Sequence, residues 1–594
     1  MPKQGDGMEI RKLDMKRLRT AQRVKTFLAE AGLRYDDSIR YFAGIFDPND
    51  NLVGCGGLDG NIIKCLAISS EARGEGVSAL LISHLVGEIF SSGNPHVRVF
   101  TKPEYKNLFN SLGFHVCGES GSAVLLESDS RPLEKYCDYL SRHKADGVIV
   151  ANADPATRGH LHLIRVAASQ CNRLAVITVG PHPKNSFGYT ERLSMLKKAT
   201  AHLHNVEILE GSDYVIPRLS FPSYFIKKAD EVSRAQAETD LDIFRRHIAP
   251  ALGCVKRFVG TEPLDRLTSQ YNSLMKELLP ASGIEVVEIE RVEEDGTPVS
   301  ASRVRKALAE WDLRYALPLV PVSDTPYLLA LLAEKALRQE LELSPKPGLV
   351  DPYDSGSHSD MDYALMSRSI DSLRDFFVRL AVMAFESDNI DNSTLRSMGL
   401  EAEKEMMKAT GGVNTHRGAI FSMGLTVAAA AKILSGKSCR TLADEIASLA
   451  RDFPRPPEST HGQTVRRRFG MPGALENAEN GYAALFEEWL PFYRNTGKTD
   501  ADRLCLLMKI IGELDDSNAV YRAGLQKADA ARRKAVCVMQ SGCDRNQLLK
   551  LNEEFKRDNI SHGGAADMLA LTFFIDSIYD SLDNLNVKTV KTLN

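Results

Sequence analysis

The sequence lacks the features that mark several classes of protein. Its ten cysteines contain no CxxC pair, so neither a zinc ribbon nor a dithiol redox site is indicated. The first twenty residues lack the apolar core of a signal peptide, and we expect no apolar run long enough to cross a bilayer. We therefore expect reduced thiols, a cytoplasmic location and no membrane partner.

The sequence also lacks a strong excess of charge. The formal net charge is -4 over 594 residues, which gives no reason to expect nucleic acid as a partner. Internal repeats and low-complexity stretches are missing as well. Hydrophobic residues make up 43% and charged residues 26%, as in ordinary globular protein. A chain of this length exceeds one hydrophobic core, so two to four domains are expected.

The pattern along the chain changes from mixed to helical. Residues 1–130 mix short β-rich runs with a helix after a glycine turn, and residues 131–322 alternate strand-like runs with helices, which is typical of a parallel α/β sheet. These strand runs are Gly147–Ala151, Leu174–Val179, Val206–Leu209, Val255–Gly260 and Ile284–Ile289. The proline-containing stretch Pro318–Pro326 is interpreted as a linker.

Residues 323–594 are expected to form an all-α domain, because nearly every segment beyond the linker has helical periodicity. The predicted helices are Leu328–Glu342, Tyr363–Phe385, Gly418–Leu434, Arg503–Leu514 and Ala565–Ser581.

A turn suited to phosphate follows the first of the α/β strands. In GVIVANADPATRGHLHLI, residues 147–164, Gly159 and His160 open a helix after an apolar strand. A helix N-terminus offers free N–H groups to a triphosphate, and a histidine there can stabilise charge on departing pyrophosphate. Taken alone, this segment is explained better by Thr157 as a helix cap and His160 as a surface residue.

A second segment, PVSASRVRKAL at 298–308, places Ser300, Ser302 and Arg305 at the start of another helix. Its hydroxyls can cap the helix or bind phosphate, and Arg305 can form a fork to phosphate oxygens. Together the two segments resemble the HxGH nucleotidyltransferase superfamily, which implies a Rossmann-like parallel sheet. A coenzyme A-pathway adenylyltransferase would share this motif and is one alternative.

Three further segments narrow the resemblance. RLSFPSYFIKKADEV (218–232), DLDIFRRHIAPALG (240–253) and FVGTEPLDRLTSQYN (258–272) resemble citrate lyase ligase, which acetylates the thiol arm of the lyase's acyl carrier protein. One departure is Asp154 with Ala156, where the family usually reads NPF around the proline. Asp154 would add a carboxylate beside the triphosphate.

The ligase resemblance implies attack of acetate on the α-phosphate of ATP and then attack of the carrier's thiol on acetyl-adenylate. It assigns the triphosphate to Thr157, His160, Ser302 and Arg305, with Mg²⁺ screening its charge. The adenosine or acetate side would be lined by Gly260, Thr261 and Glu262.

The region Val53–Cys117 resembles a GNAT acyltransferase domain of α+β fold. The segment EARGEGVSALLISHL places Arg73 and Gly76 where that fold holds a coenzyme A pyrophosphate, although Ser78 replaces the last small residue. We interpret this region as a docking surface for the coenzyme A-like arm of the carrier, without acetyltransferase activity of its own.

Four polar, glycine-bearing clusters interrupt the helices of the last domain. They are Ser344–Asp362, Gly411–Phe421, Asp515–Gly524 and Asn559–Ala570. Each alone is explained by a glycine-capped helix end, but four in one domain indicate loops that converge on a polyphosphate. Lys346, His416 and Arg417 would bind anionic oxygens, and exposed carboxylates at Asp360, Asp516 and Asp567 would hold Mg²⁺ or act in catalysis.

These clusters resemble triphosphoribosyl-dephospho-CoA synthase, whose signatures are PGLVD, GSHxDM, GVNTHKG, DTN and SPGGSAD. The resemblance implies transfer of the triphosphoribosyl group of ATP to dephospho-CoA with release of adenine. Substituted positions include Arg417 for lysine, Ser517 for threonine and His562 for proline. The motifs place these further residues at the ATP site: Gly348, His358, Asn414, Gly563 and Gly564.

One segment departs more strongly. Gly473–Ala483 reads GALENAENGYA, where the synthase family usually has GARGEAxxGFP, so Leu475, Glu476 and Asn477 replace Arg, Gly and Glu, and Tyr482 replaces Phe. An assembly scaffold with an inactive last domain is therefore an alternative to a two-activity enzyme.

Overall fold

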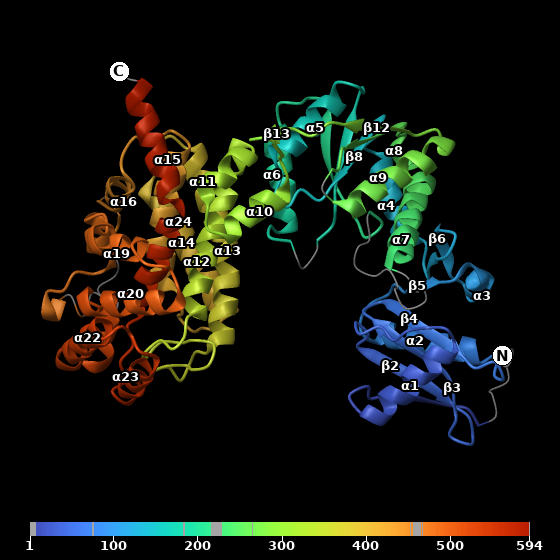
Figure 1. Ribbon diagram of the computed structural model, residues 1–594, viewed down its shortest axis with the longest axis horizontal. Helices are drawn as coiled ribbons and strands as arrows, with labels where there is room; N and C mark the ends of the chain where they lie inside the picture. The colour runs from blue at the N-terminus through green and yellow to red at the C-terminus, as the bar shows by residue number, and fades with distance from the viewer. Residues whose placement is uncertain are drawn as a thin grey trace. The chain divides into compact units, whose positions relative to one another are not determined.

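The structure, a computed structural model, describes residues 7–73, 76–181, 185–215, 229–263, 265–451, 453–455, 465 and 467–592. The chain forms two compact units, Met1–Val299 and Ser300–Asn594. The first is mixed α/β and the second is helical (Figure 1). The segment 218–228, which carries most of the first ligase-like signature, lies outside the described residues.

Unit 1 begins with a mixed seven-stranded sheet in the order β1-β2-β3-β4-β5-β7-β6. Its strands are β1 (Glu9–Lys12), β2 (Tyr41–Phe46), β3 (Leu52–Asp59), β4 (Ile62–Ile68), β5 (Arg98–Thr101), β6 (His115–Glu119) and β7 (Val124–Glu127). Alternate residues of β2 point to opposite faces: Ala43 and Ile45 pack with α2 (Val77–Ser91), and Phe42 and Phe46 pack with α1 (Leu18–Glu30). A short helix, α3 (Lys106–Ser111), precedes β6.

A second sheet in unit 1 is parallel throughout, with the order β10-β9-β8-β11-β12. Its strands confirm the five predicted runs to within a residue: β8 (Gly147–Ala151), β9 (Leu174–Thr178), β10 (Val206–Glu210), β11 (Lys256–Gly260) and β12 (Glu285–Ile289). The helices around it are α4 (Arg131–Ser141), α5 (Arg158–Ala168), α6 (Tyr189–Thr200), α7 (Ala229–Ile243), α8 (Ala249–Leu252) and α9 (Arg266–Leu278), and the hairpin β13 (Glu293–Glu294) with β14 (Thr297–Pro298) follows β12.

The strand order reverses between β8 and β11, because β9 and β10 lie to one side of β8 and β11 and β12 to the other. In open parallel sheets, ligands bind beyond the carboxyl ends of the strands at such a reversal. We therefore expect a ligand beyond the ends of β8 and β11.

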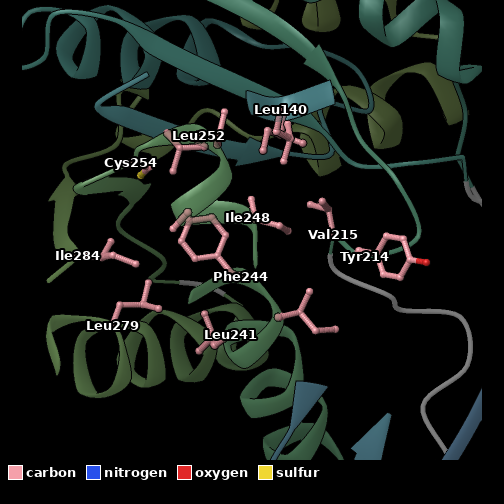
Figure 2. Close-up of a cluster of buried hydrophobic side chains, with 14 of the residues drawn as sticks. Leu140, Tyr214, Val215, Leu241, Phe244, Ile248, Leu252, Cys254, Leu279 and Ile284 are labelled. Atoms are coloured by element: carbon pink, nitrogen blue, oxygen red, sulfur yellow. The ribbon is translucent and has the colours of Figure 1, made fainter. Parts of the chain in front are cut away.

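One apolar core joins the two sheets of unit 1. Leu241 of α7, Phe244 and Ile248 of the following π-turn, and Leu252 of α8 lie in this cluster (Figure 2). The cluster also includes Phe100, Cys117 and Leu125 from the first sheet. At Gly118 of β6 a Cβ atom would lie 2.5 Å from Ile243 Cγ1. The expected domains 1–130 and 131–322 thus share buried surface.

Unit 2 contains α10 (Ala301–Ala309), α11 (Leu313–Ala316), α12 (Thr325–Glu342), α13 (Tyr363–Glu386), α14 (Asn392–Ala409), α15 (Arg417–Leu434), α16 (Leu442–Arg451), α18 (Ala474–Glu479), α19 (Leu490–Arg494), α20 (Asp500–Glu513), α21 (Ser517–Ala523), α22 (Leu525–Gln540), α23 (Arg545–Arg557) and α24 (Gly563–Thr592). Within the described residues of this unit no strand is present. The all-α expectation is confirmed, and the five predicted helices start within three residues of their observed starts.

The central helix of unit 2 corrects one expectation. By length and composition α15 could cross a membrane, with a mean hydropathy of 1.3, although 72% of that window is buried inside the protein. Its run Ala428–Ala431 is fully buried and the helix packs on α12, α13, α16 and α24. The small side chains allow neighbouring helices to approach closely, which explains a long apolar run in a core helix.

The stretch Pro318–Pro326 differs from the predicted linker. It forms two short 3-10 turns, Leu317–Leu319 and Val322–Asp324, and runs directly into α12. Val320, Asp324 and Thr325 are buried. Pro318 and Pro326 each occupy a first helical turn, where proline needs no N–H partner. The prolines therefore begin helical turns here.

The expectation of reduced thiols is wrong for one pair. Cys505 of α20 and Cys543, which follows α22, form a disulfide with a Cα–Cα distance of 5.6 Å. Because α20 packs along α22, residues 38 positions apart become neighbours. The spacing in the sequence gives no sign of this contact.

Two candidate active sites

The predicted phosphate turn in unit 1 lies at the carboxyl end of β8, and Thr157 caps α5. His160 N–H donates to Thr157 Oγ1 at 3.3 Å, while His160 Nδ1 accepts from Thr157 N–H at 3.1 Å. The neutral ring then carries its proton on Nε2, which can donate to an anion. At Gly159 a Cβ atom would lie 3.0 Å from the Val299 carbonyl oxygen, so only glycine fits without a shift.

Gly260, Thr261 and Glu262 end β11, on the other side of the strand-order reversal. Thr261 N–H donates to Ile289 O at 2.9 Å, and Thr261 Oγ1 accepts from Arg291 N–H at 3.2 Å. Arg291 also forms an ion pair with Glu262. The structure thus brings the two predicted groups, 157–160 and 260–262, to the same edge of the sheet.

Asp154, the departure from the NPF pattern, is held by the backbone. Its Oδ1 accepts from Phe187 N–H at 2.9 Å and its Oδ2 from Ser186 N–H at 3.1 Å. Asp154 is buried, and its carboxylate interacts electrostatically with the guanidinium of Arg192. We conclude that Asp154 fixes the segment that leads into α6, and that its charge is engaged inside the protein.

Arg192 is a residue that sequence reasoning missed. It is fully buried in α6, and its guanidinium donates to Asn152 O at 2.5 Å, Val179 O at 3.0 Å and Gly180 O at 3.1 Å. These carbonyls follow β8 and β9, so Arg192 ties the two strand ends together and adds a buried positive charge near the ligand edge. An arginine within the apolar pattern of α6 was the available signal.

Ser300, Ser302 and Arg305 open α10. Ser300 Oγ accepts from Arg303 N–H at 3.3 Å and caps the helix, and Arg305 donates to Ser302 Oγ at 3.1 Å. Ser302 is exposed. Ser300 is the first residue of unit 2. The residue before it in the chain, Val299, is the one whose carbonyl oxygen lies against Gly159.

The coenzyme A loop predicted in the first sheet is described only in part. Gly76 has φ 77° and precedes α2, and Arg73 is exposed. Gly74 and Glu75 between them lie outside the described residues.

In unit 2 the four polar clusters meet around the start of α24. His358 Nε2 lies 2.8 Å from Ser561 Oγ, and Ser357 Oγ donates to Ile560 O at 2.6 Å. Arg522 joins three clusters, since it donates to Ser357 O, to Asn559 Oδ1 at 2.7 Å, and lies 3.4 Å from His358 Nδ1. The loops do converge, while their binding of a polyphosphate stays a prediction. Arg522 is a member that the sequence reasoning missed.

Asp516 and Asp567 lie at the centre of this convergence. Asp516 accepts from Asn518 N–H at 2.8 Å and from Ala565 N–H at 3.0 Å, so it caps α21 and fixes α24. At Gly564 a Cβ atom would lie 3.0 Å from Asp516 Oδ2, and at Gly563 3.2 Å from Asn518 Nδ2. The two glycines therefore let α24 start directly against α21.

The three aspartates do not form the exposed metal cluster that we expected. Only Asp360 is exposed, and it lies 3.8 Å from His358 Nδ1. Burial beside Glu340 and Asp516 raises the pKa of Asp567 well above its ordinary value, so this carboxyl resists ionisation. In the described ranges, no group of three or more His, Cys, Asp or Glu side chains could hold a metal ion. The reason is that Asp516 accepts hydrogen bonds from backbone N–H groups, while Asp360 lies in a different loop.

The predicted anion-binding residues differ in their surroundings. Lys346 is buried and its Nζ pairs with Glu340. His416 is buried against Ser369 Oγ at 2.7 Å, and burial lowers its pKa to about 4, so it is neutral at pH 7. Arg417 and Asn414 are exposed, with Arg417 Nε donating to Glu403 at 2.9 Å. Of the three cationic candidates only Arg417 is open to a phosphate.

Gly348 serves close packing. It has φ 71°, its N–H donates to Asn552 Oδ1 at 2.9 Å, and a Cβ atom there would lie 2.4 Å from Ile560 O. Gly348 therefore lets the 344–362 loop contact the segment before α24, which is a supporting role for the site.

The altered segment 473–483 forms α18. Leu475 is buried, and Glu476 caps the helix by accepting from Gly473 N–H at 3.0 Å while it pairs with Arg455 at 2.7 Å. These replacements stabilise a short helix and carry no free cation for a phosphate.

Gly418, at the start of α15, is a third residue that the sequence reasoning missed. A Cβ atom there would lie 2.0 Å from Asp567 Oδ2. Gly418→Ala should therefore displace the carboxyl and lower the adenine release that the synthase resemblance implies roughly 10- to 100-fold, because misplaced groups lose much of their effect. The overlap should also cost about 1–3 kcal/mol of stability, although alanine suits a helix better than glycine.

The matched control for this change is Gly399→Ala in α14, where a Cβ atom meets nothing within 4 Å. Adenine release and the thermal midpoint of both variants would be measured. Equal adenine release by the two variants would show that the position of Asp567 does not matter.

Known families match both halves of the chain. The family described as citrate lyase ligase C-terminal domain matches residues 146–328, and that described as ATP:dephospho-CoA triphosphoribosyl transferase matches residues 326–585. A citrate (pro-3S)-lyase ligase of Escherichia coli strain K12 is 41% identical over 319 residues, which are 52% of this chain and 90% of that protein.

The relatives of the second half are synthases. A probable 2-(5''-triphosphoribosyl)-3'-dephosphocoenzyme-A synthase of Stutzerimonas stutzeri is 40% identical over 265 residues, 42% of this chain and 91% of that protein. The corresponding synthase of Klebsiella pneumoniae is 38% identical over 263 residues, 42% of this chain and 94% of that protein. The crystal structure of Escherichia coli ElaA covers 20% of this chain and 99% of its own at 18% identity, with a TM-score of 0.18, which is too low to assign a fold.

Each half of the chain thus spans nearly the whole of a separate enzyme, and the two matches follow one another without a gap. The chain belongs to the citrate lyase ligase family in its first half and to the triphosphoribosyl-dephospho-CoA synthase family in its second half, as a fusion of the two.

Proposed function

We propose that this chain acetylates the thiol arm of the acyl carrier protein of citrate lyase and also makes the precursor of that arm from ATP and dephospho-CoA. The observation that carries the proposal is that each half assembles its own polar site. One site is the capped turn at the reversal of the parallel sheet, and the other is the convergence of four loops on α24.

In the ligase step, an acetate oxygen attacks the α-phosphorus of ATP and pyrophosphate leaves. The carrier's thiol then attacks the acetyl carbonyl, AMP leaves and the thiol proton is released. His160 Nε2–H would donate to the leaving phosphates, and Thr157 holds the ring for that task. Ser300, Ser302 and Arg305 remain phosphate candidates by their motif, and Gly260, Thr261 and Glu262 candidates for the adenosine or acetate side.

In the synthase step, the 2'-hydroxyl of dephospho-CoA attacks C1 of the ribose of ATP and adenine leaves. The hydroxyl loses a proton and adenine gains one. Positive charge develops on the ribose, and we assign its stabilisation to the carboxyl of Asp516. Because Asp567 holds its proton to an unusually high pH, it suits proton transfer better than metal binding.

Mg²⁺ would reach either site as the partner of ATP, bound to its phosphates. The carrier protein, acetate and dephospho-CoA are the other partners of the proposal, and ATP use places the protein in the cytoplasm. We assign the first sheet, GNAT-like in its pattern, to docking of the coenzyme A-like arm, with Arg73 and Gly76 at the pyrophosphate.

The scaffold alternative predicts a second site that has decayed, and the convergence of Arg522, His358, Ser561 and Asp516 argues against decay. The adenylyltransferase alternative conflicts with the family match over residues 146–328. Free adenine from ATP and dephospho-CoA tests the synthase, and AMP that depends on acetate and the thiol form of the carrier tests the ligase. Either product missing from the full chain would remove that activity.

A further inference from the structure

Several polar atoms of unit 2 are buried without a hydrogen-bond partner among the residues that the structure describes. They include the hydroxyl of Tyr482 and both ring nitrogens of His562. Tyr482 is 4% exposed and His562 is 1% exposed. Buried polar groups in native proteins are nearly always bonded, so these orphaned atoms point to a bound polar group.

Each of these side chains borders one of the two central carboxyls. His562 Nδ1 lies 4.0 Å from Asp516 Oδ2. Burial raises the pKa of Tyr482, and the nearby carboxyl of Asp567 raises it further. His562 directly precedes the first residue of α24, and Asp567 lies on that helix. The orphaned atoms therefore flank the centre of the synthase site.

The backbone at Tyr482 is also unusual. Its φ is 54°, and the preceding Gly481 has φ 62°. A non-glycine residue in the left-handed region is strained, and such strain concentrates at functional sites. The synthase pattern has phenylalanine at 482 and proline at 562, so this chain has gained a hydroxyl and an imidazole at these positions.

The charge around these atoms selects the part of ATP that fits. Tyr482 and Asp567 hold their protons, because burial raises the pKa of both groups, and burial lowers the pKa of His562. Such uncharged groups suit the neutral hydroxyls of the ribose better than the anionic triphosphate. A ribose hydroxyl can donate to a carboxyl or an imidazole nitrogen and accept from a tyrosine hydroxyl at the same time.

We propose that Tyr482 and His562 bind the ribose hydroxyls of the ATP whose triphosphoribosyl group is transferred, an inference that rests on the proposed synthase activity. The triphosphate then lies away from Asp516 and Asp567, toward the exposed Arg417. The two residues position the ribose against the carboxyls.

The test uses the full chain with Tyr482→Phe and, as a second variant, His562→Leu. Removing an orphaned buried polar group should leave the thermal midpoint of the free protein unchanged or raised. The KM for ATP in adenine release should rise roughly 3- to 10-fold, as expected for one lost hydrogen bond, with a smaller change in kcat. Wild-type protein should discriminate against 2'-deoxy-ATP or 3'-deoxy-ATP, and the variants should discriminate less.

Tyr493→Phe is the matched control. Tyr493 is equally buried, but its hydroxyl accepts from Arg503 Nε at 3.4 Å, so its loss should lower the midpoint and leave the KM for ATP unchanged. Tyr482→Phe and His562→Leu proteins with wild-type KM and wild-type discrimination between ATP and the deoxy analogues would overturn the inference.

A binding readout separates this inference from the proposed function. The two tryptophans, Trp311 and Trp489, both belong to unit 2, so their fluorescence follows its unfolding. ATP should raise this midpoint more in wild type than in either variant. If wild type released no adenine but showed this difference, the synthase activity would fail and the ribose contact would stand; equal ATP-induced shifts in all proteins would reject the contact.

Discussion

Replacing Lys346 with methionine should lower the free energy of unfolding of unit 2 by about 3–5 kcal/mol, because it leaves one member of a buried ion pair without its partner. Lys346 Nζ pairs with the Glu340 carboxylate and donates to Glu340 O at 2.7 Å. Tryptophan fluorescence during urea unfolding measures the change, since both tryptophans lie in unit 2.

The loss should depend on pH. Burial already raises the pKa of Glu340 despite Lys346, and without the lysine it should rise further. A carboxyl whose folded pKa is raised binds its proton more tightly in the folded state. Stability is then highest below the unfolded pKa and falls as pH rises through the folded pKa. The Lys346→Met penalty should therefore shrink as the solution is acidified.

Lys527→Met is the matched control for this prediction. Lys527 pairs with Asp558 at 3.0 Å on the surface, with the lysine side chain 55% exposed, and such pairs contribute about 0–1 kcal/mol. A Lys346→Met protein as stable as the control, but with weakened ATP binding, would return Lys346 to the role of a phosphate ligand that its motif suggested.

Replacing His160 with alanine should lower ligase turnover about 10²–10³-fold, the usual loss when one donor to developing charge is removed. The ring is held by Thr157, whose N–H and hydroxyl both contact Nδ1, at 3.1 Å and 2.8 Å. Adenine release should stay at the wild-type rate, because the synthase clusters all lie in unit 2.

The assay is AMP formation that requires both acetate and the thiol form of the carrier. The control is His162→Ala, two residues further along α5. His162 takes no part in the Thr157 cap or the predicted motif, so the His162→Ala protein should keep wild-type ligase activity. Wild-type turnover in His160→Ala would remove this histidine from the mechanism.

The elements of the fold could be predicted because their signals are local. The run Gly147–Ala151 is apolar and ends in a turn, and β8 has these bounds. Tyr363–Phe385 has unbroken helical periodicity, and α13 differs by one residue. The prolines of Pro318–Pro326 are compatible with either a linker or the start of a helix, and only the packing of the segment distinguishes the two.

The surroundings of site residues depend on contacts between distant segments, which the sequence does not show. Asp516 looked like a free carboxylate in a loop, yet Ala565 N–H, 49 residues later, binds it. Position 418 must be glycine because a Cβ atom there would overlap with Asp567, a residue 149 positions away. The motifs therefore pointed to segments that the structure brings together, while the surroundings of each member depend on its neighbours.

Quantifying adenine and AMP from one preparation of the full chain tests the central claim most directly. We predict adenine that depends on dephospho-CoA, and AMP that depends on acetate and the carrier thiol. His160→Ala should remove only the AMP, and Gly418→Ala should lower only the adenine. One substitution that removes both products, or a wild-type chain that forms only one of them, would contradict two independent active sites in one chain.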